Sequence, residues 1–245
     1  MTAATDTIRV FIGYDSRFPV LFNVAQHSII RHCSKPVAIT PIKLTHLKGV
    51  FDRERVAIQS TEFSFSRFLT PYLCDFKGWA IFMDNDIVVR TDLAELWALR
   101  DERYAVQCVK HDHQPTSHVK FMGEKQTLYN KKNWSSVMLM NCAKCSKLTP
   151  EYVNRASGLE LHQFKWLESD ALIGALPLQW NFLVEYYKHD NSAKVLHYTE
   201  GGPYYEATRH VDFAEEWFEY FRDASSSTDT DYATLTSEAV KSAQK

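Results

Sequence analysis

Residues 81–89 constrain the fold more strongly than any other segment of this chain. They form an apolar run that carries two aspartates, Asp84 and Asp86, with Asn85 between them. A continuous apolar run is typical of a strand buried on both faces, as in a parallel sheet. Successive side chains of a strand point to opposite faces, so both carboxylates should emerge on the same face. Because ligands of such sheets bind outside the carboxyl ends of the strands, the sequence predicts an α/β fold with an acidic site at that edge.

The acidic pair has more than one chemical interpretation. Carboxylate oxygens are hard ligands, and two that converge on one spot suit Mg²⁺ or Mn²⁺ with positions left for phosphate oxygens. Aspartates also end strands as turn formers or caps, so the pair alone does not establish a metal site. The pattern Asp-x-Asp-x-Val is also similar to the nucleophile motif of haloacid-dehalogenase-type phosphatases. That motif normally opens its domain, whereas a long segment precedes Asp84 here.

Composition and charge narrow the class of partner. The chain has 245 residues, of which 45% are hydrophobic and 24% charged, as in a globular protein with a sizeable core. Its formal net charge of -2 gives no electrostatic reason to expect nucleic acid or an anionic membrane as a partner. No apolar run approaches the ~20 residues that span a bilayer, and the polar start is unlike a signal peptide. We therefore expect a cytoplasmic protein without membrane insertion that acts on a small molecule.

Cysteine and histidine residues offer alternative metal sites. The odd number of five cysteines, scattered through apolar segments, favours buried reduced thiols over a disulfide framework. Cys142 and Cys145 form a single C-x-x-C without a second pair. His111, His113 and His118 lie in one polar segment, where an acceptor-binding or solvated loop is favoured over zinc.

Hydrophobic periodicity and turn residues predict alternating strands and helices within one domain. Expected strands are residues 8–12, 37–44, 81–89, 104–109, 137–141 and 195–198. Expected helices are residues 63–73, 150–161 and 164–172, one that opens at Pro19, and one capped by Asp212 and Glu215. Pro41 marks its strand as an edge strand. A run rich in Ser, Thr and Asp then predicts a domain over residues 1–223 and a flexible tail over residues 224–245.

The loop after the first strand is a candidate nucleotide site. Tyr14 and Asp15 follow that strand directly, so they lie at the carboxyl edge where a base or ribose could bind. An ordinary turn is an alternative interpretation. The loop also has a faint similarity to the Gly-rich loop of sugar nucleotidyltransferases, but it lacks that loop's further glycine.

Several segments follow one another in a recognisable order. They are residues 10–15, a strand and loop of the nucleotide-binding kind; 66–73, with Arg67 and Pro71 on a helix; 83–89; 135–141; 168–170 followed by 176–181; and 197–202, with a histidine before a Gly-rich loop. This order resembles glycosyltransferase family 8, the retaining enzymes of the glycogenin and bacterial lipopolysaccharide galactosyltransferase type. The resemblance implies the GT-A fold, in which helices flank a Rossmann-like central mixed sheet.

The resemblance also implies a role for each matching residue. Asp84, Asp86 and His197 would bind a divalent cation, for which imidazole favours Mn²⁺ over Mg²⁺. The nucleoside-diphosphate sugar would contact two further sets of residues. The first set, for the nucleotide and diphosphate, is Val10, Ile12, Tyr14, Asp15, Asn85, Gly201 and Gly202. The second set, around the donor sugar, is Arg67 together with the catalytic block Glu168, Ser169 and Asp170.

Three positions depart from the family pattern. Trp134 and Ser169 stand where the family has an asparagine and a glutamine, and Tyr204 and Tyr205 follow the Gly-rich loop where it has a lysine. The missing lysine leaves one phosphate charge to be matched by Arg17, by Arg209 or by the lysines of residues 120–132.

The sequence thus predicts a metal-dependent glycosyltransferase that moves a hexose from a nucleoside-diphosphate sugar to a hydroxyl acceptor, such as a glycan. No strong base is evident beside the anomeric carbon, so a retaining mechanism is our hypothesis. The alternatives are a haloacid-dehalogenase-type phosphatase, a sugar nucleotidyltransferase and a non-catalytic protein that binds nucleotide sugars.

Overall fold

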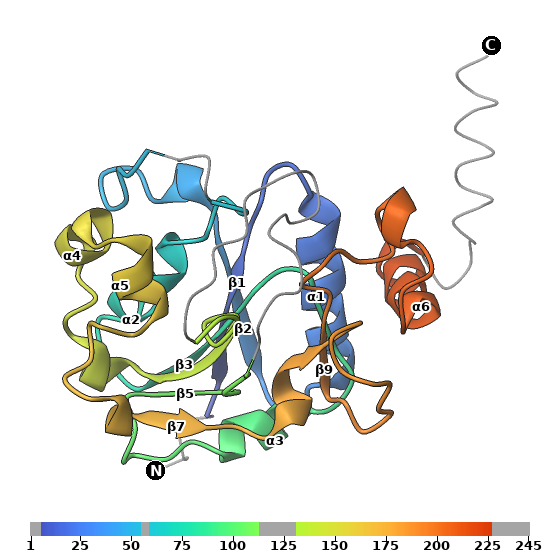
Figure 1. Cartoon of the computed structure of the whole chain (residues 1–245). Helices are drawn as coiled ribbons and strands as arrows, with labels where there is room; N and C mark the ends of the chain where they lie inside the picture. The colour runs from blue at the N-terminus through green and yellow to red at the C-terminus, as the bar shows by residue number, and fades with distance from the viewer. Residues whose placement is uncertain (1–5, 55–58, 113–130, 227–245) are drawn as a thin grey trace.

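A six-stranded mixed sheet forms the centre of the protein, for which a computed structural model describes residues 6–54, 59–112 and 131–226 (Figure 1). Across the sheet the strands are β2 (Val37–Ile42), β1 (Ile8–Gly13), β3 (Trp79–Met83), β6 (Val137–Asn141), β5 (Val106–Cys108) and β7 (Ile173–Ala175). β1 runs parallel to β2 and β3, β5 runs parallel to β7, and β6 runs antiparallel to both of its neighbours. The predicted α/β fold with a mixed sheet is confirmed, and β2, which contains Pro41, lies at the edge as predicted.

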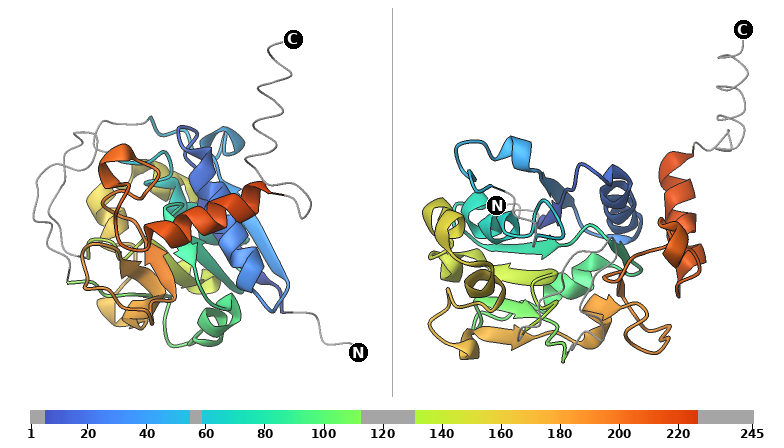
Figure 2. Two further views of the ribbon diagram at one scale, coloured as in Figure 1. Left: turned by 90° about the vertical axis from the view of Figure 1, so that its right-hand side faces the viewer. Right: turned by 45° about the horizontal axis from the view of Figure 1, so that its top comes forward.

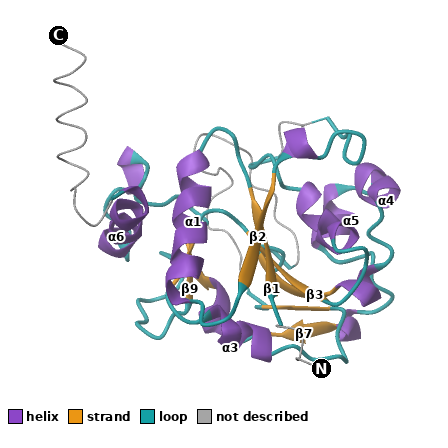
Figure 3. Ribbon diagram, turned by 180° about the vertical axis from the view of Figure 1, so that it is seen from behind, coloured by secondary structure: helices purple, strands orange, loops and turns teal. Residues whose placement is uncertain are grey.

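Helices cover both faces of this sheet (Figures 1 and 3). α1 (Pro19–His32) and α3 (Leu93–Ala98) pack on one face, and α2 (Thr70–Leu73), α4 (Pro150–Arg155) and α5 (Gly158–His162) pack on the other. β3 is buried throughout because its side chains alternate between the two layers. Ile81 and Met83 join the core beneath α1 and α3, and Phe82 joins the core beneath the other three helices.

A smaller sheet stands beside the first and contains β4 (Ile87–Val89), β9 (Val195–His197) and β8 (Phe182–Leu183) in that order. β9 runs antiparallel to β4 and parallel to β8. Leu21 and Val24 of α1 share a third core with Leu196 of β9 and Trp217 of α6 (Ala214–Ser225). Figure 2 shows α6 crossing over the outer side of α1.

The structure corrects the prediction of one strand over residues 81–89. β3 ends at Met83 and β4 begins at Ile87, so the two aspartates lie in the turn where the chain passes from the large sheet to the small one. The predicted helix over residues 164–172 is also wrong. Phe164 has a φ of 58°, and the segment consists of turns and one 3₁₀ turn, Asp170–Leu172, before β7.

Other helices differ from their predicted bounds. The segment expected as one helix over residues 150–161 is two, because Ser157 and Glu160 form a capping box that starts α5. The segment 63–73 is a 3₁₀ turn, Ser66–Leu69, followed by α2, and Pro71 lies in the first turn of α2, where a proline is tolerated. Asp212 does not cap α6, because its carboxylate contacts His189 instead.

Three further expectations concern the C-terminal tail, the cysteines and the absence of a membrane span. α6 ends at Ser225, two residues beyond the predicted domain end, and residues 227–245 of the proposed tail lie outside the described residues, as do His113 and His118. Cys74, Cys108, Cys142 and Cys145 are buried free thiols, and Cys33 is half-buried. Within the described residues, no helix has both the length and the apolar character needed to cross a membrane.

Candidate active site

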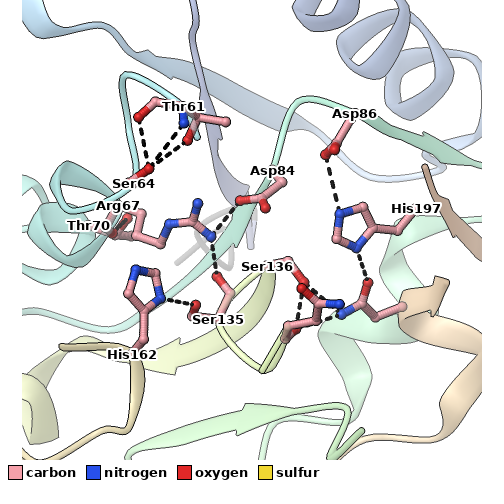
Figure 4. A network of polar contacts seen from close by, with 12 residues as sticks. Thr61, Ser64, Arg67, Thr70, Asp84, Asp86, Ser135, Ser136, His162 and His197 are labelled. Atoms are coloured by element: carbon pink, nitrogen blue, oxygen red, sulfur yellow. Dashed lines mark hydrogen bonds and ion pairs between the residues drawn. The ribbon is translucent and has the colours of Figure 1, made fainter. Parts of the chain in front are cut away.

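Asp84, Asp86 and His197 meet where the two sheets join (Figure 4). One ligand atom from each lies within 4.8 Å of the others, and Nε2 of His197 is 3.4 Å from Oδ1 of Asp86. His197 ends β9 and pairs with Ile87, the first residue of β4, so strand register brings it beside the aspartates. The predicted grouping is confirmed, although strand alternation is not its cause. The backbone holds the turn instead, since Asp84 N–H donates to the Ser136 carbonyl at 2.8 Å.

This donor set fits a divalent cation. The side chains of Asp84 and Asp86 are 14% and 23% exposed, and that of His197 is 2% exposed. Two carboxylates and one imidazole therefore face one partly enclosed point. Carboxylate and imidazole ligands together suit Mn²⁺ and related divalent cations.

We call Asp84, Asp86 and His197 the metal-ligand cluster, after the cation that they could hold. The buried side chain of Arg67 contacts this cluster. Its Nη1 is 2.7 Å from Oδ1 of Asp84 and donates to the Ser135 carbonyl at 3.0 Å (Figure 4). The rings of Phe63 and Phe82 lie 5.3 Å and 5.1 Å from its guanidinium carbon. The structure therefore places Arg67 against a predicted metal ligand, a contact that the sequence did not reveal because 17 residues separate the two.

His197 is supported from its other ring nitrogen. Nδ1 of His197 lies 3.0 Å from Oδ1 of Asn181, a buried residue in the 3₁₀ turn Leu178–Asn181. The Asn181 amide nitrogen in turn contacts the Ser136 hydroxyl and the Asn133 carbonyl. Sequence reasoning missed this role, because the only signal was an asparagine directly after the apolar Trp180.

A cavity of about 110 Å³ lies beside Asp86. Its walls include Asp15 and Arg17 from the loop after β1, Asn85 and Asp86 from the β3–β4 turn, and Gly201 from the loop after β9. Arg17 is the one Lys or Arg residue among the described residues that line it. Asn85 is buried, and its amide nitrogen has no hydrogen-bond partner in the part of the chain that the structure describes.

Arg17 is fixed in this wall by Asp15. Its Nε and Nη2 donate to the two carboxylate oxygens of Asp15 at 2.9 Å and 2.7 Å, and Nη2 also donates to the Ser60 carbonyl at 2.8 Å. Burial raises the pKa of Asp15, but the hydrogen bonds and charge of Arg17 outweigh burial and hold that pKa below its ordinary value of 3.8. A guanidinium is thus anchored in the wall of the cavity that Gly201 also lines. Arg209 does not line the cavity, and its guanidinium carbon lies 5.3 Å from the ring centroid of Phe218.

The Gly-rich loop packs closely against its own aromatic residues. Gly201 has a φ of 114°, a conformation that favours glycine. A Cβ at Gly202 would lie 2.4 Å from Cε1 of Tyr204, so the loop needs glycine there to pack as it does. Gly201 reaches the cavity with Tyr204 and Tyr205.

The predicted nucleotide residues divide into two groups. Asp15 lines the cavity, but Val10 and Ile12 are fully buried in the core, so their side chains cannot touch a ligand. Tyr14 packs on Phe22 and does not line the cavity.

The predicted catalytic block lies in an exposed turn. The side chain of Asp170 is 69% exposed, and its Oδ1 contacts Nζ of Lys131 at 2.6 Å. This hydrogen bond with Lys131 lowers the pKa of Asp170. Ser169 caps the 3₁₀ turn that follows it, and Glu168 is exposed. None of the three belongs to the metal-ligand cluster or lines the cavity.

Solved glycosyltransferases share this fold. The bifunctional glycosyltransferase WbbM has a TM-score of 0.60 and 18% identity, with 90% of this chain and 50% of WbbM covered. GlyE of Streptococcus pneumoniae has a TM-score of 0.59 and 17% identity, with 97% of this chain and 64% of GlyE covered. The galactosyltransferase LgtC, solved with donor and acceptor sugar analogues, has a TM-score of 0.53 and 13% identity, with 90% of this chain and 97% of LgtC covered.

These comparisons confirm the GT-A type of fold, although the chain spans only half the length of WbbM and 64% of GlyE. No protein-family model matches the sequence. One curated protein is similar over most of its length: Protein CDI of Arabidopsis thaliana is 46% identical over 218 residues, which cover 85% of this chain and 84% of that protein. The chain therefore belongs to the family of Protein CDI.

Proposed function

We propose that this protein is a metal-dependent glycosyltransferase that moves a hexose from a nucleoside-diphosphate sugar to a hydroxyl acceptor. The observation that carries the proposal is the Asp84, Asp86 and His197 cluster, which lies at the carboxyl end of β3 on a glycosyltransferase fold. Ligands of open α/β sheets bind outside the carboxyl ends of the strands, which is where this cluster lies.

The three clustered residues would hold a divalent cation, with Mn²⁺ favoured by the imidazole. Such a cation, when bound, supplies positive charge that stabilises a departing nucleoside diphosphate. The chain contributes the fixed arrangement of ligands. Arg67 holds the carboxylate of Asp84, and the burial of His197 limits the motion of its ring.

The cavity beside Asp86 would receive the diphosphate. Arg17 brings a guanidinium that suits phosphate oxygens, and Asp15 fixes its orientation. The amide nitrogen of Asn85 is a donor that a phosphate oxygen would satisfy, and Gly201 allows a close approach of the backbone. Arg17 would thus take the role of the lysine that glycosyltransferase family 8 carries after its Gly-rich loop.

The donor sugar and the acceptor would meet on the side of Asp170. Lys131 orients the Asp170 carboxylate, and Ser169 and Glu168 precede it in the same turn. A carbohydrate acceptor would deliver its hydroxyl there, and we retain the hypothesis that the anomeric configuration is preserved. A product whose anomeric configuration is inverted would remove that hypothesis.

A turnover assay tests the proposed function. The full chain is incubated with a panel of nucleoside-diphosphate sugars and simple glycosides, with Mn²⁺, with Mg²⁺ or with a chelator, and released nucleoside diphosphate is measured. We expect release with at least one donor, strongest with Mn²⁺ and absent with the chelator.

Each rival activity gives a different result in this assay. Phosphate release from simple phosphate esters would indicate a phosphatase instead. Pyrophosphate release from a nucleoside triphosphate and a sugar phosphate would indicate a nucleotidyltransferase. Donor binding without turnover, under every acceptor and metal tried, would contradict catalysis.

A further inference from the structure

The carboxamide of Asn181 connects the metal-ligand cluster to the turn that precedes β6. Its Oδ1 lies 3.0 Å from Nδ1 of His197, and its Nδ2 lies 2.9 Å from the Ser136 hydroxyl and 3.2 Å from the Asn133 carbonyl. The side chain is fully buried, as is that of His197. These contacts determine where the protons lie.

Asn133 and Ser136 determine the orientation of the Asn181 amide. The Asn133 carbonyl can only accept, and the Ser136 hydroxyl already donates its proton to that carbonyl at 2.6 Å. Both groups therefore require donors from Asn181, which only its NH₂ group supplies. The opposite orientation would place the Asn181 oxygen against the Asn133 oxygen at 3.2 Å.

The orientation of the Asn181 amide in turn determines the tautomer of His197. The Asn181 oxygen can only accept, so Nδ1 of His197 carries a proton and donates it. In the neutral imidazole, Nε2 then presents its lone pair, and this atom faces the Asp86 carboxylate at 3.4 Å (Figure 4). A lone pair and a carboxylate repel each other, and a cation held by both relieves that repulsion.

We infer that Asn181, anchored by Ser136 and Asn133, is a positioning residue that locks His197 in the tautomer whose Nε2 is ready to bind a divalent cation. The inference rests on the proposed metal site and names a residue that prepares it. The same turn also fixes a second ligand, because the Ser136 carbonyl accepts the backbone N–H of Asp84. One short segment thus orients both a carboxylate and an imidazole.

Two measurements on metal-free protein test this inference. Long-range ¹H–¹⁵N NMR of histidine-labelled protein reports the His197 tautomer, and electron paramagnetic resonance of free Mn²⁺ gives the affinity of the site. We expect the Nδ1–H tautomer in the wild type. In Asn181→Leu, which has a similar volume but no acceptor, we expect a shift toward Nε2–H and a loss of Mn²⁺ affinity of ~10–100-fold, as for other groups that orient metal ligands.

Further variants separate positioning from a general loss of structure. Asn181→Asp keeps an acceptor for Nδ1, so its Mn²⁺ affinity should exceed that of Asn181→Leu. Ser136→Ala removes one of the two anchors and should weaken Mn²⁺ binding less than Asn181→Leu, which provides a test if the leucine variant does not fold. The matched control is Asn191→Leu, whose Oδ1 lies 3.1 Å from Nε2 of the exposed His189. It should leave Mn²⁺ affinity unchanged.

The outcomes distinguish this inference from the proposed function. If the wild type binds Mn²⁺ but carries the Nε2–H tautomer when metal-free, the inference is overturned and the metal site stands. The same holds if Asn181→Leu, or Ser136→Ala where the leucine variant does not fold, binds Mn²⁺ like the wild type with the tautomer unchanged. If the wild type binds no Mn²⁺, both the proposed metal site and the inference are overturned.

Discussion

The metal-ligand cluster and the turn around Asp170 are both acidic, but they are built in opposite ways. Asp84 and Asp86 lie in the turn between β3 and β4, and His197 is the last residue of β9. The buried residues Arg67 and Asn181 contact Asp84 and His197, respectively. Asp170 lies in a turn with most of its side chain in solvent, and its carboxylate contacts Lys131. Buried contacts therefore fix the side chains of the metal-ligand cluster, whereas the turn around Asp170 is exposed to solvent.

This difference matters for function because the two regions would face different ends of the donor. Every nucleoside-diphosphate sugar carries the same diphosphate, which suits a rigid cluster with fixed charges. Sugars and acceptors vary, which suits an exposed turn that can change without loss of the core. We therefore expect substitutions in the cluster to have large effects on binding and stability, and substitutions at Asp170 to have small ones.

The largest expected effect follows from removing a metal ligand. His197→Ala should abolish Mn²⁺ binding and lower turnover by ~10³-fold or more, because a bound cation contributes several kcal/mol to the stabilisation of the transition state. Mn²⁺ titration and nucleoside diphosphate release measure both effects. His189→Ala is the control, since that histidine pairs with Asp212 on the surface. Equal Mn²⁺ affinity in His197→Ala and wild type would remove this residue from the site.

Next in size is the loss of the buried ion pair behind the cluster. Arg67→Met removes the guanidinium whose Nη1 lies 2.7 Å from Oδ1 of Asp84. Breaking a buried ion pair in this way lowers the free energy of unfolding by about 3–5 kcal/mol. Urea denaturation of metal-free protein measures the loss. Arg155→Met, in an exposed i,i+4 pair with Glu151, should cost only ~0.5 kcal/mol or less. Similar losses in both variants would contradict the contrast between buried and exposed regions.

A smaller effect is expected from neutralising the cavity pair. The double variant Asp15→Asn with Arg17→Gln removes both charges together, so no buried charge is left without its partner. Hydrogen bonds to charged groups contribute about 1.5–3 kcal/mol, so nucleoside diphosphate affinity should fall by ~10-fold or more while Mn²⁺ affinity is retained. Asp101→Asn with Arg103→Gln is the matched control, because it has the same spacing and pairing on the surface. Unchanged nucleotide affinity would show that Arg17 is not the phosphate ligand.

The pH dependence of stability offers a test of the same pair. The folded state holds the pKa of Asp15 below 3.8, so this carboxylate stabilises the protein above that pH, and its contribution is lost as pH falls through the lowered value. Wild-type stability should therefore decline below about pH 4 more steeply than that of Asp15→Asn. Thermal unfolding between neutral and acid pH measures this difference. An equal fall in the unfolding temperature of the two proteins at acid pH would contradict a charged, buried Asp15.

The smallest effect is expected at Asp170. Asp170→Asn breaks an exposed pair with Lys131, and such pairs contribute about 0–1 kcal/mol. Unfolding free energy and Mn²⁺ affinity should therefore stay close to those of the wild type. A loss of unfolding free energy as large as that of Arg67→Met would contradict the contrast between the buried cluster and the exposed turn.

The grouping of Asp84, Asp86 and His197 could be predicted because each of these residues carries a local signal. An Asp-x-Asp pair after an apolar strand and a histidine before a Gly-rich loop both lie at strand ends, and strand ends meet at one edge of a sheet. The assumed geometry was wrong, because β3 and β4 belong to different sheets. The three residues nevertheless lie together, because the pairing of β4 with β9 brings His197 beside the turn that carries the two aspartates.

The supporting contacts were not predictable in the same way. Asn181 contacts residues 16 positions ahead and 45 positions behind it, and neither its neighbours nor its spacing indicates these partners. Periodicity also failed over residues 164–172, where the left-handed Phe164 and tertiary contacts such as that of Lys131 with the Gln163 carbonyl override helical spacing. The sequence therefore predicted the grouping of residues near strand ends. It did not predict contacts or backbone conformations that depend on residues far away in the sequence.

The most direct test of the central claim is calorimetric titration of nucleoside diphosphates into the wild type and Asp86→Ala, each with and without Mn²⁺. We predict that at least one nucleoside diphosphate binds the wild type in the presence of Mn²⁺, and that binding is lost when either the cation or the Asp86 carboxylate is removed. Equal binding without Mn²⁺, or equal binding by Asp86→Ala, would contradict a metal-dependent donor site at the junction of the two sheets.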